Sequence, residues 1–172
     1  MSAISDKIIA TAKSYIGETE LTNNSGWIDK AFQQKMVDVG WKNGDSWCAF
    51  TCELIWKEAY GKGSPIFPRL DRLFSSSATA TAANFIASND FKTGKIPQPG
   101  ALVLWRHGNG WQGHAGVVTG IIDSSTFESV EGNTNQDGSS NGYAVFLKKR
   151  KLGEAFKPKG FNIVCFVYPV GI

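Results

Sequence analysis

One cysteine of this 172-residue sequence stands where a helix is expected to begin. Residues 41–61 contain a polar, glycine-containing turn followed by an apolar stretch. Four small or apolar residues recur at spacings of four, three and four, which is one helical stripe: Cys48, Cys52, Ile55 and Ala59. We expect Asp45 or Ser46 to cap this helix and Gly61 to end it. The pattern therefore predicts that Cys48 lies in the first turn of the helix.

A cysteine in a first helical turn can act as a nucleophile. The unpaired N–H groups and the positive end of the helix dipole favour its thiolate. Cys52 lies a full turn further in and is expected in the core, as is Cys165 on a buried strand shared with Ile163 and Val167. Glu53 and Lys57 form an i,i+4 pair that we expect on the solvent side of the helix.

A cysteine nucleophile needs a base within hydrogen-bond reach, and that base needs a third group to fix its tautomer. The sequence contains only two histidines, His107 and His114. His107 belongs to the glycine-rich stretch 106–113, which predicts a loop. His114 begins a strand, whose backbone pairing fixes the direction of the side chain, so we expect His114 to be the base.

The next predicted strand, residues 126–134, supplies a carboxylate and an amide. Glu131 and Asn133 are two residues apart, so an extended strand places them on one face, together with Ser129 and Phe127. Either group could orient the imidazole of His114 through its second nitrogen. The combination of a helix-start cysteine, a strand-start histidine and this pair indicates a thiol hydrolase more strongly than any part alone.

Secondary structure changes in character along the chain. Apolar spacing predicts helices over residues 2–16, 27–39, 48–60 and 75–89, the last begun by a serine cap, with a polar loop at 18–26 and a connector at 61–72. From residue 96 onward, turn residues separate five predicted strands, at 101–105, 114–122, 126–134, 142–150 and 161–168. Helices followed by an antiparallel sheet are the α+β pattern, and we expect one domain over residues 1–172.

Four stretches of the chain resemble the CHAP family, the cysteine, histidine-dependent amidohydrolases/peptidases. They are W-C-A-F before the apolar helix, P-Q-P-G-A-L-V-L-W, G-H-A-G-V-V-T-G-I and V-E-G-N-T. The resemblance covers nearly the whole chain. It implies a papain-like α+β fold and hydrolysis of amide bonds in peptidoglycan through a thioester. Carried over to this sequence, it implies Cys48 as nucleophile, His114 as base, Glu131 as orienting carboxylate and Asn133 as supporting amide.

Two departures from the family are visible. Many CHAP domains have glutamine before the cysteine, where it helps to hold the oxyanion, but this sequence has Trp47. The second oxyanion donor is therefore open, with Ser46 and Asn43 as candidates. Some phage members carry an aspartate-rich calcium loop before the cysteine, whereas residues 41–46 offer Asp45 alone. We expect neither a metal nor another cofactor.

The sequence contains six tryptophans, of which three are expected to pack in the core: Trp27, Trp56 and Trp105. Trp47 beside the nucleophile and Trp111 in the loop before His114 have equal claims to two roles. They could line a substrate groove for glycan or peptide, or they could be core residues.

Composition excludes several classes of function. A net charge of +3 is too small to indicate a nucleic-acid partner, although it would help approach to an anionic polymer. Three cysteines give no disulfide framework, and charged residues interrupt the N-terminal stretch that a signal peptide would need. No run is long enough for a membrane span. We expect a monomer made in the cytoplasm, with peptidoglycan as its partner.

Three readings of function remain in order. The first is a cysteine amidohydrolase of peptidoglycan, either an N-acetylmuramoyl-L-alanine amidase or an endopeptidase. The second keeps the catalytic residues but acts on a small non-wall amide or transfers an acyl group. The third is an inactive wall-binding module, which has no need of a thiol at a helix start. A phage endolysin released by a holin and a secreted bacterial lysin or effector with an immunity protein both fit the first reading.

Overall fold

The computed structural model describes residues 2–135 and 142–171 of the chain. In its first half these residues form five α-helices and one short 3₁₀ helix. They are α1 (Ala3–Ser14), η1 (Thr22–Asn24), α2 (Lys30–Asp38), α3 (Cys48–Tyr60), α4 (Phe67–Leu73) and α5 (Ala78–Ala87). Serine or aspartate side chains cap three of these helices, Ser2 on α1, Asp29 on α2 and Ser77 on α5. The predicted serine cap on the last helix is confirmed.

The second half of the chain forms one antiparallel sheet. Its strands are β1 (Thr93–Gly94), β2 (Leu102–His107), β3 (Gly113–Asp123), β4 (Thr126–Thr134), β5 (Ala144–Lys151) and β6 (Phe161–Val167). They lie in the order β1-β6-β2-β3-β4-β5, so the last strand enters the sheet between β1 and β2 instead of extending an edge. Helices followed by an antiparallel sheet confirm the predicted α+β class.

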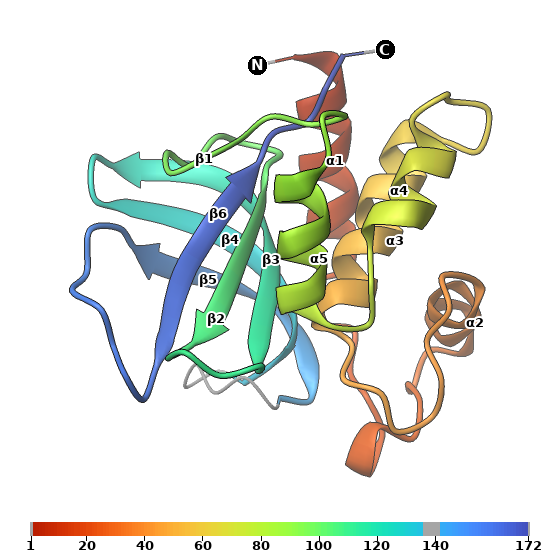
Figure 1. The fold of residues 1–172 in the computed structure, drawn as a ribbon. Helices are drawn as coiled ribbons and strands as arrows, with labels where there is room; N and C mark the ends of the chain where they lie inside the picture. The colour runs from red at the N-terminus through yellow and green to blue at the C-terminus, as the bar shows by residue number, and fades with distance from the viewer. Residues whose placement is uncertain (1, 136–141, 172) are drawn as a thin grey trace.

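The helices cover one face of the sheet, as Figure 1 shows. Helix α3 packs against β3 and β4 on one side and against α1 on the other. Buried apolar residues of the helices and of the helix-facing strand positions form the larger core, while a smaller cluster occupies the opposite face around Trp105, Phe127 and Phe166. Because α3 is buried on nearly all sides, its first residue is held firmly against the sheet.

Two local predictions about the helices are wrong. The expected connector contains α4, which starts beside Pro68 and buries Leu70 completely, since proline is tolerated in a first helical turn. Glu53 and Lys57 are not on a solvent face, because both are buried at 6% and 7% exposure. Lys57 bonds Glu53 at 2.6 Å and also pairs with Asp71, so α4 covers the side of α3 that the spacing assigned to water.

No helix within the described residues is long and apolar enough to cross a membrane.

Candidate active site

Cys48 is the first residue of α3. Trp47 occupies the N-cap position, and no side chain caps the helix. The expected cap by Asp45 or Ser46 is therefore wrong; the Asp45 carboxylate instead accepts a hydrogen bond from the backbone N–H of Lys42 at 3.2 Å. Because no side chain occupies the cap position of α3, the first-turn N–H groups stay available for negative charge on a thiolate or on a substrate oxygen.

His114 lies near the start of β3 and faces this thiol. Its side chain is 3% exposed, and Nε2 donates to Oε2 of Glu131 at 2.8 Å. Nδ1 makes no hydrogen bond to any described residue in this arrangement, yet Cys48 is near enough to act on the ring. Catalytic hydrogen bonds are often long before substrate binds and tighten afterwards. Nδ1 is therefore the nitrogen left to exchange a proton with the Cys48 sulfur.

Opposing influences set the charge of His114. Burial lowers its pKa, but the hydrogen-bonding and charge interactions with Cys48 and Glu131 outweigh burial and raise the pKa to about 9. The imidazolium form is thus favoured at neutral pH when a thiolate and a carboxylate stand on its two sides. This is the ionic pair that a thiol hydrolase needs.

Glu131 is the carboxylate that orients His114. It is completely buried on β4, where it accepts hydrogen bonds from His114, from the Ser129 hydroxyl at 2.6 Å, and from Arg150. Burial raises the pKa of Glu131, but Arg150 and His114 lower it further, to about 2. The expected common face of Glu131, Ser129 and Phe127 on this strand agrees with these contacts.

Asn133 does not share that face. Its φ is +53°, and the pairing of β4 with β5 shifts between Glu131 and Thr134, so the strand alternation ends before Asn133. Asparagine tolerates this left-handed conformation better than most residues. The side chain is 1% exposed, and no described residue bonds its Oδ1. The ring nitrogen that Asn133 was expected to orient is bonded by Glu131 instead.

The two tryptophans with open roles separate clearly. Trp47 is fully buried, its indole N–H donates to Glu20 at 2.6 Å, and its ring packs against Trp27, so the structure corrects the groove-lining role for Trp47. Trp111 is 81% exposed at the tip of the β2–β3 connection, and its backbone carbonyl accepts from the Thr79 hydroxyl at 2.8 Å. Trp111 alone offers a flat apolar surface to a ligand.

His107 lies apart from the catalytic group at the end of β2. Its ring packs edge-on against Phe161, with 5.4 Å between the ring centroids. The structure thus brings His114, Glu131 and Cys48 together and leaves the second histidine outside.

Two glycines allow the close approach of these elements. An added Cβ at Gly116 would lie 2.7 Å from Cγ of Glu131, and one at Gly132 would lie 2.8 Å from the Trp47 ring. Gly132 therefore lets β4 reach the first turn of α3, where Cys48 begins the helix. A methyl group at either position would displace a catalytic element.

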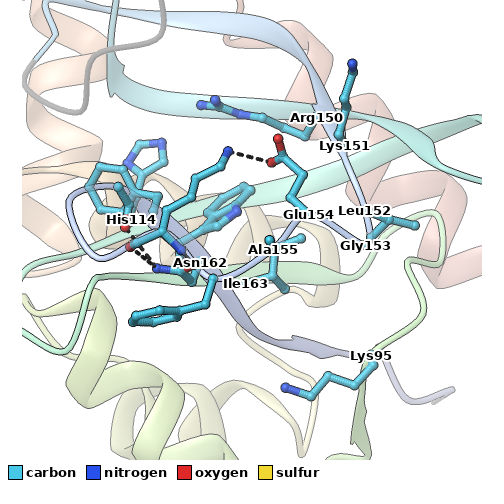
Figure 2. A pocket seen from close by; sticks show the side chains of 15 residues that line it. Lys95, His114, Arg150, Lys151, Leu152, Gly153, Glu154, Ala155, Asn162 and Ile163 are labelled. Carbon is cyan, nitrogen blue, oxygen red and sulfur yellow. Dashed lines mark hydrogen bonds and ion pairs between the residues drawn. The ribbon is translucent and has the colours of Figure 1, made fainter.

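A cavity of about 560 Å³ opens beside His114 on the sheet face away from the helices, as Figure 2 shows. Trp105 and Phe161 form part of its wall, and the connection between β5 and β6 closes the other side. Its charged lining is mostly cationic, with Lys95, Arg150, Lys151 and Lys157 against Glu154, which Lys157 bonds at 2.8 Å. Arg150 connects this cavity to Glu131.

Arg150 is the residue of the site that the sequence analysis missed. It stands in the run Lys148 to Lys151 on β5, where one cation among several attracts no notice. A usable signal existed, since a buried carboxylate requires a compensating cation and arginine is the type that binds carboxylates through two nitrogens. Among the described residues, no group of three or more His, Cys, Asp or Glu side chains could hold a metal.

The family profile of the CHAP domain matches residues 15–133, more than half of the chain. This chain belongs to the CHAP family. The family comprises cysteine- and histidine-dependent amidohydrolases and peptidases of peptidoglycan, which agrees with the thiol and imidazole that the fold brings together. The matched CHAP segment contains Cys48, His114 and Glu131 and ends before β5, which carries Arg150. A comparison with curated proteins gives no match.

Proposed function

We propose that this CHAP protein hydrolyses an amide bond in the peptides of peptidoglycan, with Cys48, His114 and Glu131 as its catalytic group. The observation that carries the proposal is the bonded pair of His114 and Glu131 beside a thiol at the uncapped start of α3. Nucleophile, base and orienting group are the three parts that covalent amide hydrolysis requires.

In the first half of the proposed reaction, the Cys48 thiolate attacks the amide carbonyl carbon and forms a C–S bond. The carbonyl oxygen becomes an oxyanion, which the backbone N–H of Cys48 can bind. His114 then gives its Nδ1 proton to the amide nitrogen, the C–N bond breaks, and the amine leaves. Ser46 and Asn43, both exposed before α3, are the candidates for a second oxyanion donor.

In the second half, His114 is neutral and acts as the base. It takes a proton from water at Nδ1 while the water oxygen attacks the thioester carbon. The C–S bond breaks, the acid product leaves, and the thiolate and imidazolium are restored. Throughout, Glu131 accepts the Nε2 proton of His114, which keeps Nδ1 directed at the reacting atoms.

The setting of the site supports a wall polymer as substrate. Trp111 projects from the connection that precedes His114, and an exposed indole can stack on a sugar or peptide. The cationic cavity beside His114 suits the carboxylates of wall peptides. Both an N-acetylmuramoyl-L-alanine amidase and an endopeptidase fit, as an endolysin reaching the wall after holin release or as a secreted effector paired with an immunity protein.

The experiment adds purified protein to isolated sacculi. We expect turbidity to fall and free amino groups to appear without new reducing sugar ends, because the bond cut is an amide. Cys48→Ala protein, which removes only the sulfur, is the matched control and should leave the sacculi intact. New reducing ends without amines would mean a glycosidase and would refute the proposal. Mass analysis of the fragments would identify the bond.

One observation favours the small-amide alternative. Cys48 and His114 are only 6% and 3% exposed, so the site is narrow before substrate binds. Release of amines from small soluble amides, with sacculi untouched, would support that alternative.

A further inference from the structure

We propose that Arg150 is a positioning residue for the hydrolysis, which holds Glu131 ionised and in one orientation so that His114 keeps its proton on Nε2. This inference rests on the proposed function for the roles of Cys48 and His114. It assigns a role to a residue beyond the segment that matches the CHAP family.

The first argument is the geometry of the guanidinium. Its Nε donates to Oε1 of Glu131 at 2.8 Å, and its Nη2 donates to Oε2. Two parallel bonds from one rigid fork fix both the position and the rotation of a carboxylate. Ser129 bonds Oε1 and His114 bonds Oε2, so each carboxylate oxygen has one bond from Arg150 and one from a neighbour. Glu131 cannot turn without breaking the fork.

The second argument is how Arg150 itself is held. It lies on β5 opposite Phe127 of β4, two residues along the strand from Ser129. Its guanidinium carbon lies 5.5 Å from the ring centroid of Trp105, over whose face the cation is favoured. The side chain is 26% exposed, on the side that borders the cavity. Strand pairing and a tryptophan face thus hold the fork in register with Glu131.

The third argument concerns where protons lie during the reaction. A protonated Glu131 could donate its O–H to Nε2 of His114, and the ring proton would then sit on Nδ1. Neutral His114 would be unable to take a proton from the attacking water, and hydrolysis of the thioester would stop. Arg150 prevents this by keeping Glu131 an acceptor, even though the carboxylate is completely buried.

The charged and titratable groups around Glu131 come from three elements. Arg150 of β5 and His114 of β3 favour its ionised form, and Cys48 and Cys52 of α3 lie close enough to interact with this cluster. Arg150 also interacts with Glu154. Of these, Arg150 is the permanent cation, because its charge does not change during the reaction, whereas that of His114 does.

The test compares Arg150→Gln and Arg150→Lys with a matched control, Lys149→Gln. Lys149 is the neighbouring exposed cation of β5, paired opposite Glu128, so its loss changes the net charge equally without touching Glu131. Two quantities are measured against pH. One is the rate of Cys48 alkylation by iodoacetamide, assigned by peptide mass analysis; the other is kcat and KM for amine release from solubilised peptidoglycan.

For Arg150→Gln we expect the acid limb of both profiles to move up by at least about one pH unit, since Glu131 then protonates at higher pH. We expect kcat to fall about 10- to 100-fold, the usual cost of losing such an outer partner, with KM nearly unchanged. Arg150→Lys restores the charge but not the fork, so its acid limb should match wild type while kcat stays reduced. Lys149→Gln should behave as wild type.

An acid limb and kcat for Arg150→Gln equal to those of Lys149→Gln would overturn the proposal. If Arg150→Gln fails to fold by circular dichroism, Arg150→Lys decides: wild-type kcat would overturn the proposal, and reduced kcat with a wild-type acid limb would support it. Alkylation needs no wall substrate. A shifted alkylation profile in protein that leaves peptidoglycan uncut would therefore support the role of Arg150 and reject the proposed substrate.

Discussion

Cys48 and Cys52 carry the same side chain on the same helix, one turn apart, yet their surroundings differ. Cys48 begins α3 beside His114, and no side chain caps the turn that holds it. Cys52 is 1% exposed inside the helix, and burial together with the charges of Cys48 and Glu131 raises its pKa well above the usual range. Reactivity is therefore a property of the position, because only the first turn supplies a base and free N–H groups.

Two other pairs of similar residues follow the same division. His114 is bonded to Glu131, whereas His107 packs on Phe161. Glu131 has its oxygens fully bonded, whereas the side-chain oxygen of Asn133 has no partner among the described residues. In each pair the member expected to be catalytic lies on an element that reaches Cys48. Substituting both members of a pair tests this division directly.

The largest effect is expected for the cysteines. Cys48→Ala should lower kcat at least about 10⁴-fold, because the nucleophile is lost and its partners cannot act alone. Cys52→Ala should keep nearly full activity and lose about 1 kcal/mol of unfolding free energy from the vacated core volume. Turnover and urea unfolding of both variants measure this. Activity lost in folded Cys52→Ala but kept in Cys48→Ala would reverse the assignment.

The histidines should differ almost as strongly. His114→Ala should lower kcat about 10³- to 10⁴-fold, since both the base and the acid of the reaction are removed. His107→Ala should remain close to wild type, because its ring contacts no catalytic residue. Steady-state kinetics of the two variants provide the comparison. An equal loss in both would give His107 a part in substrate binding.

Glu131 should matter more than Asn133. Glu131→Gln should reduce kcat about 10²- to 10⁴-fold, because the amide cannot stabilise the imidazolium and can reverse the tautomer. Asn133→Ala should cost less in turnover and more in stability, as its left-handed backbone then holds a residue that disfavours it. The reverse order of kcat values would make Asn133 the orienting group.

The pH dependence should show a falling limb near pH 9. The pKa of His114 is raised to about 9, so the imidazolium is present below that value and is lost as pH rises through it. Above this limb kcat/KM should fall about tenfold per pH unit. The same group stabilises the fold at pH values below its unfolded pKa, and that stability is lost over the rise to about 9. A falling limb near pH 6.5 would mean that Cys48 and Glu131 do not act on the ring.

The smallest effect is expected at Trp111. Trp111→Ala should raise KM for sacculi about 3- to 10-fold through the loss of one stacking contact, with kcat unchanged. Thermal stability should not change, since the side chain is 81% exposed. Trp47→Phe serves as the contrast, because it removes the N–H that Glu20 accepts and should lower stability. Unchanged KM in Trp111→Ala would exclude this indole from binding.

Local patterns in the sequence predict most of the elements and the reacting pair. The strand at residues 126–134 has the predicted bounds, because alternation and flanking turns are local signals. The position of Cys48 at a helix start follows from spacing in the same way. The common face of Ser129 and Glu131 follows from strand alternation, and the hydrogen bond between them agrees with it.

What the sequence could not predict depends on contacts between distant segments. Lys57 is buried because Asp71 of α4 pairs with it, and no spacing within α3 reveals that partner. Ile163 was expected beside Cys165, but the pairing of β2 with β6 shifts between them, so Ile163 packs with the cluster on the opposite face. Arg150 reaches Glu131 only through the register of β4 with β5. Each outcome required knowing which strands or helices become neighbours.

The central place of β6 has a consequence for synthesis of the chain. β6 pairs with β2, about sixty residues earlier, and brings Phe161 to within 5.9 Å of the His114 ring, measured between ring centroids. Contacts so distant in sequence form late in folding. A ribosome-bound chain can build helices and the hairpins from β2 to β5, but its histidine lacks one wall until residues 161–167 emerge. Nascent chains should therefore have no finished catalytic centre, and the cell meets the active hydrolase only after the translation of its last strand.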